Sequence, residues 1–259
     1  MAGEIRTDDS RLLRGRDGAW ILTRGTAAGA VALALETRSG CVPVSGDGRG
    51  AVWRFPLPDG GEGLLRESCR GGWAGRVLRR HYLLVNRPRW EWQVHLRAWQ
   101  LGLPTVEPLG VRWRWEGPLC AGMLATRYAQ GWSLARWVEM TPEAEARREG
   151  LRRAGAAVRR IHDAGLLHVD LQIRNLLVTP AGDILLLDWD RGRDRGRPAT
   201  RAERSHGVFR FRRSTEKAGW SSDLFEAFLE GYGDFRPVWR VERLWALKRV
   251  TAPRAGRME

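Results

Sequence analysis

In the first half of the chain, apolar residues recur at every second position within several short segments, which is the period of a β-strand. Residues 106–115 show it most clearly, because valine and tryptophan alternate there with arginine. Residues 121–128 form another apolar run of strand length. Short apolar runs at 51–55 and 63–67 flank a turn at 58–61 and predict a hairpin. The N-terminal half is therefore predicted to be rich in strands.

A helical period dominates the second half of the chain. Residues 88–101 already predict a helix, which Gly102 ends, and residues 142–164 predict a longer one with Pro142 in its first turn. The buried stripe of the longer helix is predicted to contain Leu151, Ala154, Val158 and Ile161. The remaining predicted elements are short strands at 176–178 and 184–187 and helices at 222–232 and 238–250.

This order of elements predicts an α+β fold with a β-rich N-terminal lobe and a mainly helical C-terminal lobe. Residues 129–131 break the strand pattern, and Ser133 is placed to cap a helix, so the lobe boundary is predicted there. The predicted division is an N-terminal extension at 1–40, an N-lobe at 41–130 and a C-lobe at 131–259. The extension shows only a possible pair of short strands or a helix, and the sequence assigns it no role.

Composition narrows the class of protein. Of the 259 residues, 43% are hydrophobic, yet no apolar run reaches the length of a membrane-spanning helix. No pattern typical of a signal peptide is found. Cys41, Cys69 and Cys120 are widely spaced and the histidines lack zinc spacing, so we expect neither a disulfide framework nor a structural metal. We expect a protein of the cytosol or one bound peripherally to a membrane.

The chain is strongly basic, with a net charge of +14. Of the 44 basic residues, all except Lys217 and Lys248 are arginine, which partly reflects the codon bias of a GC-rich genome. The charge favours nucleic acid, acidic lipid or a phosphorylated substrate as partner, and does not choose among them. The 14 tryptophans fall mostly at core spacing, which favours packing over base stacking and argues against nucleic acid.

The strongest chemical signal is the segment His168-Val169-Asp170-Leu171-Gln172-Ile173-Arg174-Asn175, which an apolar strand ending in Asp188 follows. Asp170 precedes Asn175 by five positions and Asn175 precedes Asp188 by thirteen, the spacing of a kinase catalytic loop and its metal-binding strand. Asp170 is predicted to accept or orient the proton of the acceptor hydroxyl. Asn175 and Asp188 are predicted to hold Mg²⁺, which prefers oxygen ligands. His168 is expected to order the loop.

A kinase also needs a basic side chain on its third strand, held by a glutamate on the next helix. Arg66 and Glu91 occur in that order. Arginine in place of lysine is a departure, since the two cations bind phosphate differently. The glycine-rich turn with Gly48 and Gly50 is predicted to cover the nucleotide phosphates. Asp190 has two interpretations, a ligand of a second metal or a turn residue.

Nine arginines gather between residues 191 and 213, with Asp194 and Glu203 as the only acids. One interpretation is a solvated, partly disordered loop. The other is a cradle for a polyanionic acceptor or an anionic membrane, to which each basic residue would contribute about 1 kcal/mol.

These features together resemble the lipopolysaccharide-core kinases, and among them the kinases of 3-deoxy-D-manno-octulosonic acid (Kdo). The resemblance extends from about residue 44 to about residue 235 and is most specific in the run Asp188-Trp189-Asp190-Arg191-Gly192. Further matching segments are Leu65-Arg66, Arg70-Gly71-Gly72, His81-Tyr82, Glu91, Gly102-Leu103-Pro104-Thr105-Val106, Ile161-His162-Asp163-Ala164-Gly165, His168-Val169-Asp170-Leu171, Asn175-Leu176-Leu177 and Arg212-Arg213-Ser214-Thr215-Glu216-Lys217.

The resemblance implies a two-lobed, protein-kinase-like fold and transfer of the γ-phosphate of ATP to a sugar hydroxyl. In Kdo kinases the acceptor is the 4-hydroxyl of Kdo on lipid A precursor, at the cytoplasmic face of the bacterial inner membrane. Val169 and the segment Gln172-Ile173-Arg174 depart from the family pattern. Since Val169 stands where many protein kinases have an arginine, activity without prior phosphorylation is expected.

Two alternatives stay open. Another acceptor, such as core heptose, a protein Ser/Thr or a small molecule, would change the substrate and keep the chemistry. A pseudokinase that binds lipid or nucleic acid would change both. The sequence leaves the exact hydroxyl, the oligomeric state and the full replacement of lysine by Arg66 open.

Overall fold

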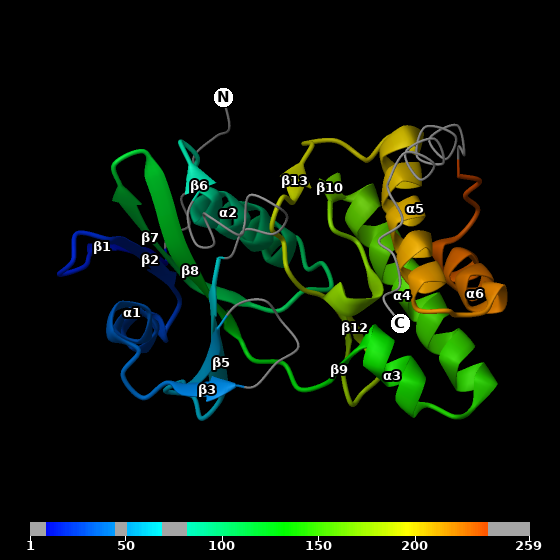
Figure 1. The fold of residues 1–259 in the computed structure, drawn as a ribbon, viewed down its shortest axis with the longest axis horizontal. Helices are drawn as coiled ribbons and strands as arrows, with labels where there is room; N and C mark the ends of the chain where they lie inside the picture. The colour runs from blue at the N-terminus through cyan, green and yellow to red at the C-terminus, as the bar shows by residue number, and fades with distance from the viewer. Residues whose placement is uncertain (1–8, 45–50, 69–81, 238–259) are drawn as a thin grey trace, which may run out of the picture.

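An antiparallel sheet region and a helical region make up the fold, seen side by side in the ribbon of Figure 1. The structure, a computed structural model, describes residues 9–44, 51–68 and 82–237. The strand order of the large sheet is β1-β2-β7-β8-β5-β4-β3, with β6 paired to β8. Its strands are β1 (Ser10–Arg14), β2 (Trp20–Arg24), β3 (Val42–Val44), β4 (Val52–Pro56), β5 (Glu62–Glu67), β6 (Tyr82–Leu83), β7 (Pro108–Glu116) and β8 (Leu119–Arg127).

The predicted hairpin is present as β4 and β5. Val52 pairs with Arg66 at its open end, and the backbone N–H of Leu57 donates to the carbonyl of Gly61 (2.9 Å) at its turn. Gly60 lies in the left-handed region at φ 79°, where glycine carries no steric penalty. Because β5 also pairs with β8, Arg66 lies in the interior of the sheet rather than at its edge.

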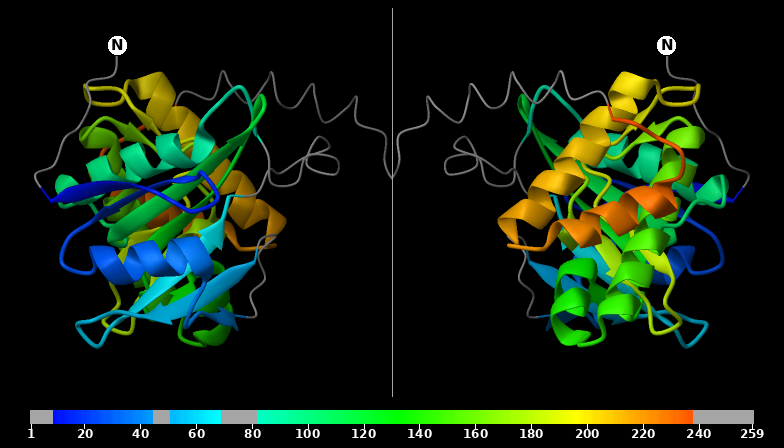
Figure 2. Two further views of the ribbon diagram at one scale, coloured as in Figure 1. Left: turned by 90° about the vertical axis from the view of Figure 1, so that its left-hand side faces the viewer. Right: turned by 90° about the vertical axis from the view of Figure 1, so that its right-hand side faces the viewer.

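Residues of the N-terminal extension join the same sheet. β1 and β2 form a hairpin, β2 pairs with β7, and α1 (Ala28–Thr37) follows. In Figure 2, α1 lies across the strands. Its buried side chains Val31 and Leu35 pack against Ile21, Ala125 and other apolar residues of one face of the sheet. These strands and this helix therefore supply part of the apolar core of the sheet region.

The predicted helix at 88–101 is confirmed as α2 (Arg87–Gln100). The Asn86 side chain accepts a hydrogen bond from the backbone N–H of Arg89 (3.1 Å) and so caps its N-terminus. Trp92 and Leu96 of α2 pack on Val111 and Leu124, which lie on the sheet face opposite α1. This packing fixes the position of the side chain of Glu91 beside β5.

The helical region contains α3 (Leu134–Met140), α4 (Ala144–Asp163), α5 (Arg201–Lys217) and α6 (Ser222–Tyr232). Its short strands are β9 (Trp132–Ser133), β10 (Leu166–Leu167), β11 (Leu176–Val178), β12 (Ile184–Leu186) and β13 (Arg193–Asp194), with the 3₁₀ turn η2 (Ile173–Asn175). All of the predicted buried stripe of α4 lies in the core. α4 begins two residues after Pro142, which therefore precedes the helix instead of occupying its first turn.

The interpretation of residues 191–213 as a partly disordered loop is wrong, because most of the segment belongs to α5 (Figure 2). Thr200 and Glu203 form a capping box at its start, which satisfies two backbone N–H groups. Val208 and Phe211 are fully buried on its inner side. The high arginine content concealed this apolar face, which is narrow.

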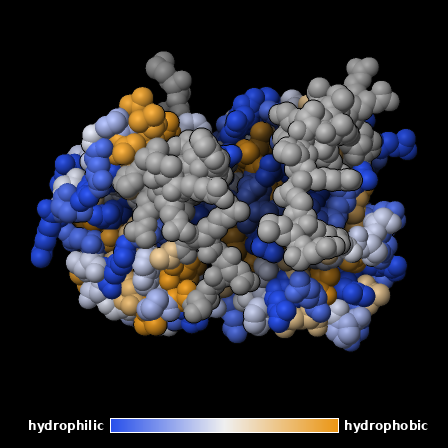
Figure 3. Space-filling view, viewed as in Figure 1, coloured by the Kyte–Doolittle hydropathy of each residue, from blue (hydrophilic) through white to orange (hydrophobic). Residues whose placement is uncertain are grey.

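Some predictions lie outside the described residues, namely Gly48, Gly50 and the helix at 238–250. Within the described ranges, none of the helices has the length and apolar character needed to cross a bilayer. The face seen in Figure 3 is mostly hydrophilic, with smaller apolar groups between the polar ones.

The close approach of α4 and α6 predicts that a side chain at their contact lowers stability. A Cβ at Gly155 would collide with the carbonyl oxygen of Phe228, whereas one at Gly29 in α1 would meet nothing within 4 Å. Gly155→Ala should lower the free energy of unfolding by about 1–3 kcal/mol through overpacking. Gly29→Ala should leave it unchanged or raise it by up to about 1 kcal/mol through helix propensity. Urea denaturation of both variants tests this, and equal effects would contradict the packing.

A buried histidine in α4 predicts that stability depends on pH. His162 is 1% exposed and hydrogen-bonds Tyr232 Oη through Nδ1 (2.7 Å). Burial, with the nearby charge of Arg204, lowers the pKa of His162 to about 3 from an ordinary 6.5. The unfolded chain therefore binds a proton below pH 6.5 that the folded chain does not, and stability falls on acidification.

For this one group, the loss of unfolding free energy between pH 7 and pH 5 should be about 2 kcal/mol. His162→Gln removes it, so the variant's stability should decline less steeply than that of the unmodified protein over that interval. Denaturant titrations at both pH values measure the two slopes. Parallel slopes would show that His162 is not held neutral.

Candidate active site

The predicted catalytic loop lies between β10 and β11, and its own hydrogen bonds shape it. Asn175 Nδ2 donates to the backbone carbonyl of Asp170 (2.8 Å), which closes the loop across five residues. The backbone N–H of Leu187 donates to the carbonyl of Asn175 (2.8 Å), which ties the loop to the end of β12. Since Asp188 follows Leu187, these bonds bring Asp170, Asn175 and Asp188 to one place.

His168 orders this loop, as the sequence predicted. Its Nε2 hydrogen-bonds the carbonyl of Leu187 (2.7 Å), and its ring packs against Trp189. Burial lowers the pKa of His168, in spite of that hydrogen bond, so the ring is held neutral and donates.

Asp188 lies at the end of β12 in a backbone conformation that few residues adopt. Its φ is 62°, in the left-handed region, which costs about 1–3 kcal/mol for a residue with a side chain. Burial raises the pKa of Asp188, but the charge of Arg66 and the backbone N–H of Asp190 outweigh it and hold the pKa below its ordinary value. Asp188 is therefore an anion at neutral pH.

The next residue, Trp189, holds the backbone in this conformation. Its ring is completely buried, and its Nε1 donates to Thr105 Oγ1 (2.9 Å). Thr105 Oγ1 in turn donates to the carbonyl of Leu186 (2.8 Å). His95 of α2 stacks against Trp189 and hydrogen-bonds the carbonyl of Val106 (2.9 Å). This buried network connects α2 with the strand that ends at Asp188.

The structure brings Arg66 and Glu91 together with Asp188. Arg66 Nη2 forms an ion pair with Glu91 Oε1 and a second with Asp188 Oδ1 (3.2 Å). Although burial opposes it, the charges of Glu91, Asp188 and Asp190 raise the pKa of Arg66. Burial raises the pKa of Glu91 to about 7 in spite of Arg66. Three elements, β5, α2 and the end of β12, thus meet around one guanidinium.

Asp190 is engaged with the start of α2. Its Oδ1 accepts a hydrogen bond from Arg87 Nε (2.7 Å), and the neighbouring Trp90 Nε1 donates to the carbonyl of Gly192 (2.9 Å). In this arrangement the Asp190 carboxylate fixes the chain after the strand, which fits the turn interpretation given above.

One residue beside the catalytic loop had no individual role in the sequence analysis. Arg210 Nη2 of α5 donates to Asp170 Oδ1, while Gln172 Nε2 donates to Asp170 Oδ2 (3.0 Å). The helical spacing of Gly207, Val208 and Phe211 was the available signal for α5, but no local pattern relates Arg210 to Asp170.

The available donors fit a magnesium ion. Asp188 is a carboxylate, and because Asn175 binds through its amide nitrogen, its oxygen remains to act as a ligand. No cluster of three or more His, Cys, Asp or Glu side chains suited to a metal occurs in the described ranges. Such a cluster is not needed, because Mg²⁺ usually takes one or two protein ligands together with substrate phosphates and water.

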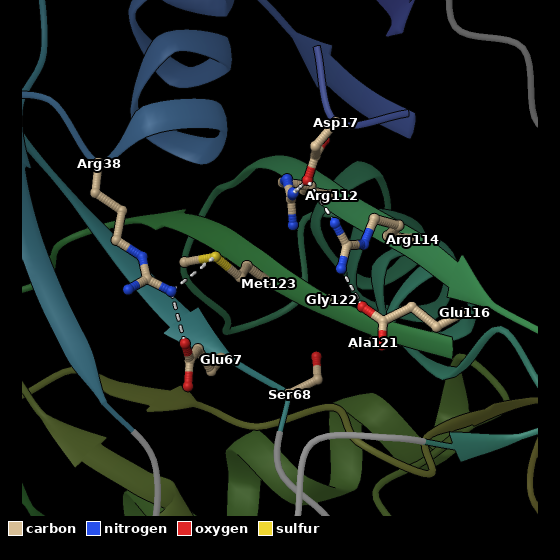
Figure 4. A pocket seen from close by; sticks show the side chains of 10 residues that line it. All are labelled: Asp17, Arg38, Glu67, Ser68, Arg112, Arg114, Glu116, Ala121, Gly122 and Met123. Atoms are coloured by element: carbon tan, nitrogen blue, oxygen red, sulfur yellow. Dashed lines mark hydrogen bonds and ion pairs between the residues drawn. The ribbon is translucent and has the colours of Figure 1, made fainter. Parts of the chain in front are cut away.

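A pocket of about 330 Å³ lies elsewhere, on the sheet face toward α1 (Figure 4). Its arginines are each paired with an acid: Arg38 with Glu67, Arg112 with Asp17 and Arg114 with Glu116. The lining is therefore balanced in charge, and none of the predicted catalytic residues belongs to it.

Comparison with known proteins identifies the family of the chain. Residues 34–232 match the lipopolysaccharide kinase (Kdo/WaaP) family, so the chain belongs to that family. It is 34% identical over 155 residues to a 3-deoxy-D-manno-octulosonic acid kinase of Xanthomonas axonopodis pv. citri. These residues are 58% of this chain and 60% of that protein.

A kinase of the same name from Xanthomonas campestris pv. campestris is 34% identical over 180 residues, which is 68% of this chain and 70% of the relative. One from Xylella fastidiosa is 32% identical over 155 residues, 58% of this chain and 60% of the relative. The chain thus matches about three fifths of the length of the first of these relatives.

The ion pairs of Arg66 with Glu91 and Asp188 predict how the loss of this arginine affects stability. In Arg66→Met the carboxyl of Glu91, whose side chain is 2% exposed, loses its counter-ion. The variant should lose about 3 kcal/mol of unfolding free energy at pH 8, the low end for a broken buried pair, because Arg66 is partly exposed. At pH 6 the loss should be smaller. Glu91 has a folded pKa above its unfolded value, so its protonated form stabilises the fold and stability falls as pH rises.

The matched control is Arg54→Met, in the neighbouring strand. Arg54 pairs with Glu62 (3.4 Å) where both side chains are at least one third exposed. Its loss should cost under about 1 kcal/mol at either pH. Urea titrations at pH 6 and pH 8 measure both variants, and a pH-independent effect of Arg66→Met would contradict the role of Glu91.

Proposed function

We propose that the protein is an ATP-dependent kinase that phosphorylates a sugar hydroxyl, the 4-hydroxyl of Kdo, in the inner core of lipopolysaccharide. The sheet region and the helical region would be the N-lobe and C-lobe of a protein-kinase-like fold, with the nucleotide between them. The observation that carries the proposal is the meeting of Asp170, Asn175 and Asp188 through the hydrogen bonds of one loop. Family membership and the names of the relatives support the same reaction.

Asp170 is the proposed catalytic base, or orients the attacking hydroxyl. In the structure, two donors engage both of its carboxylate oxygens, so the carboxylate is held in a fixed orientation. An acceptor hydroxyl has to come within about 2.6–3.2 Å of this group for proton transfer. Most of the catalytic effect of such a site comes from positioning, since phosphoryl transfer demands little covalent chemistry from the protein.

Arg66 is proposed to bind the nucleotide phosphates, with Glu91 as the group that positions it. A guanidinium has five N–H donors, so Arg66 can remain paired with Glu91 and still donate to phosphate oxygens. An ammonium has three donors and acts as a point charge. The substitution of arginine for lysine therefore keeps the charge and increases the number of directed hydrogen bonds.

Asn175 and Asp188 are the proposed ligands of Mg²⁺, which when bound supplies positive charge beside the phosphates. Gly48 and Gly50, outside the described residues, are proposed to cover the phosphates from above. In the sequence they fall between β3 and β4, which pair antiparallel.

The acceptor is proposed to be an anionic glycolipid, Kdo-linked lipid A precursor, reached by peripheral contact with the cytoplasmic face of the inner membrane. The net charge of +14 supports attraction to an acidic lipid surface. Such attraction should weaken as salt shortens the range of the charges.

The test of this function is transfer of labelled γ-phosphate from ATP and Mg²⁺ to purified Kdo–lipid A precursor, with Asp170→Asn beside the unmodified protein. The unmodified protein should label the glycolipid. The variant should lose at least about 100-fold in rate, as expected for removal of a general base.

Nucleotide-dependent thermal stabilisation of Asp170→Asn shows whether the variant still folds and binds ATP. Stabilisation with no transfer would assign the loss to chemistry. If the unmodified protein binds nucleotide and labels a core heptose or a protein in place of Kdo, the proposed acceptor is wrong.

A further inference from the structure

Arg210 is the basic side chain that touches the proposed catalytic carboxylate. Its Nη2 donates to Asp170 Oδ1, with the two side chains 38% and 40% exposed, so both remain accessible from one side. Arg210 Nε is buried and has no hydrogen-bond partner among the described residues. The guanidinium therefore has an unsatisfied buried nitrogen, and its exposed part lies beside the carboxylate that the acceptor hydroxyl must approach.

The position of Arg210 is fixed by the packing of α5 on the catalytic loop. Gly207, three residues earlier, lies close to His162 and Leu171, so that a Cβ there would be 3.0 Å from the imidazole. Ser214 Oγ, four residues later, accepts a hydrogen bond from the backbone N–H of Ile173 (3.2 Å). Phe211 is fully buried and stacks on Phe228. Because the helix is anchored on both sides of it, Arg210 is preorganised.

The surroundings of Arg210 carry an excess of positive charge. His206 lies one helical turn before it, and burial together with the charges of Arg210 and Arg193 lowers the pKa of His206. Among the described acids, Asp170 is the one that forms an ion pair with Arg210. An anionic group entering here would thus meet a cation whose charge is only partly neutralised.

We infer that Arg210 binds the carboxylate of an acidic acceptor sugar and so selects a ulosonic acid over neutral sugars. The inference rests on the proposed function. The attacking hydroxyl must lie beside Asp170, and Arg210 touches the same carboxylate, so a group on the same sugar ring comes within its reach. In Kdo the carboxylate is attached to C2 and the proposed hydroxyl to C4, with C3 between them. A guanidinium fork matches a carboxylate in a bidentate pair.

This interaction supplies a distinction that Asp170 alone cannot make. A hydroxyl of heptose or of a protein serine presents the same reacting atom but brings no carboxylate with it. A sugar without the carboxylate would leave Arg210 paired only with Asp170. The carboxylate should therefore strengthen acceptor binding and align the ring, with its main effect on KM.

The test compares Kdo–lipid A precursor with the same glycolipid whose C1 carboxylate is converted to a carboxamide. The variants are Arg210→Gln, Arg210→Lys and the control Arg153→Gln, an exposed arginine of α4 paired with Glu149 (3.1 Å). Steady-state kcat and KM are measured for each protein with each acceptor. Thermal unfolding and ATP binding confirm that the variants fold.

The unmodified protein and Arg153→Gln should prefer the acid over the amide by about 10- to 100-fold in kcat/KM, the worth of a charged hydrogen bond. Arg210→Gln should lose this preference mainly through a higher KM for the acid. Arg210→Lys should keep part of this preference, because lysine retains the positive charge but cannot form the bidentate pair of a guanidinium.

Two results would overturn the inference. One is an Arg210→Gln variant that is slower with both acceptors and still prefers the acid, which would mean that Arg210 only positions Asp170. The other is an unmodified protein that phosphorylates acid and amide equally well. Failure of the unmodified protein to phosphorylate the glycolipid at all would instead contradict the proposed function, and the inference with it.

Discussion

The guanidinium of Arg66 is the charge on which the geometry of the site depends. Strand β5 delivers it to the interior of the sheet, α2 presents Glu91 to it, and the end of β12 presents Asp188. Without the cation, these carboxylates would repel each other across a partly desolvated space, where charges interact far more strongly than in water. The ion pairs therefore set how β5, α2 and the end of β12 lie relative to one another.

A second constraint acts on the backbone of Asp188. Its left-handed conformation is unfavourable, and it persists because the surrounding structure determines it completely. The neighbouring Trp189 is sealed in the core, with its indole N–H satisfied by Thr105, and His95 stacks against it. Apolar burial at one residue thus orients the charged side chain of the residue before it. The same tryptophan contacts His168, so the catalytic loop is ordered from the same point.

Part of this arrangement could be predicted from the sequence. The spacing of Asp170, Asn175 and Asp188 is local, and local spacing constrains a loop and its following strand directly. The hairpin of β4 and β5, the helix α2 and the stripe of α4 also follow from periodicity, because each buries one regular face.

What could not be predicted depends on contacts between distant segments. Arg210 and Asp170 are forty residues apart, and nothing in either neighbourhood relates them. The α5 helix was hidden because its buried face is narrow and its arginines suggest solvent exposure. The addition of β1, β2 and α1 to the sheet depends on pairing with β7, more than eighty residues later. The sequence did not predict the positive φ of Asp188, because aspartate adopts many backbone conformations in loops.

The surroundings of Arg66 and those of Asp170 differ in how far they are buried. The proposed nucleotide side is built from partly buried ion pairs that are already formed in the protein alone. On the proposed acceptor side, Arg210 of α5 and Asp170 are both partly exposed. This division would suit the proposed kinase, in which ATP is always the donor and the charge of the acceptor distinguishes it from other sugars.

The central claim is that Arg66, Asn175 and Asp188 form a site for nucleotide phosphates and their metal ion. Calorimetric titration with ATP, in the presence and absence of Mg²⁺, tests it most directly when Asp188→Asn is measured beside the unmodified protein. The account predicts binding that strengthens with Mg²⁺ and a variant that loses this dependence. Binding that is equally tight without Mg²⁺ and unchanged in the variant would contradict it.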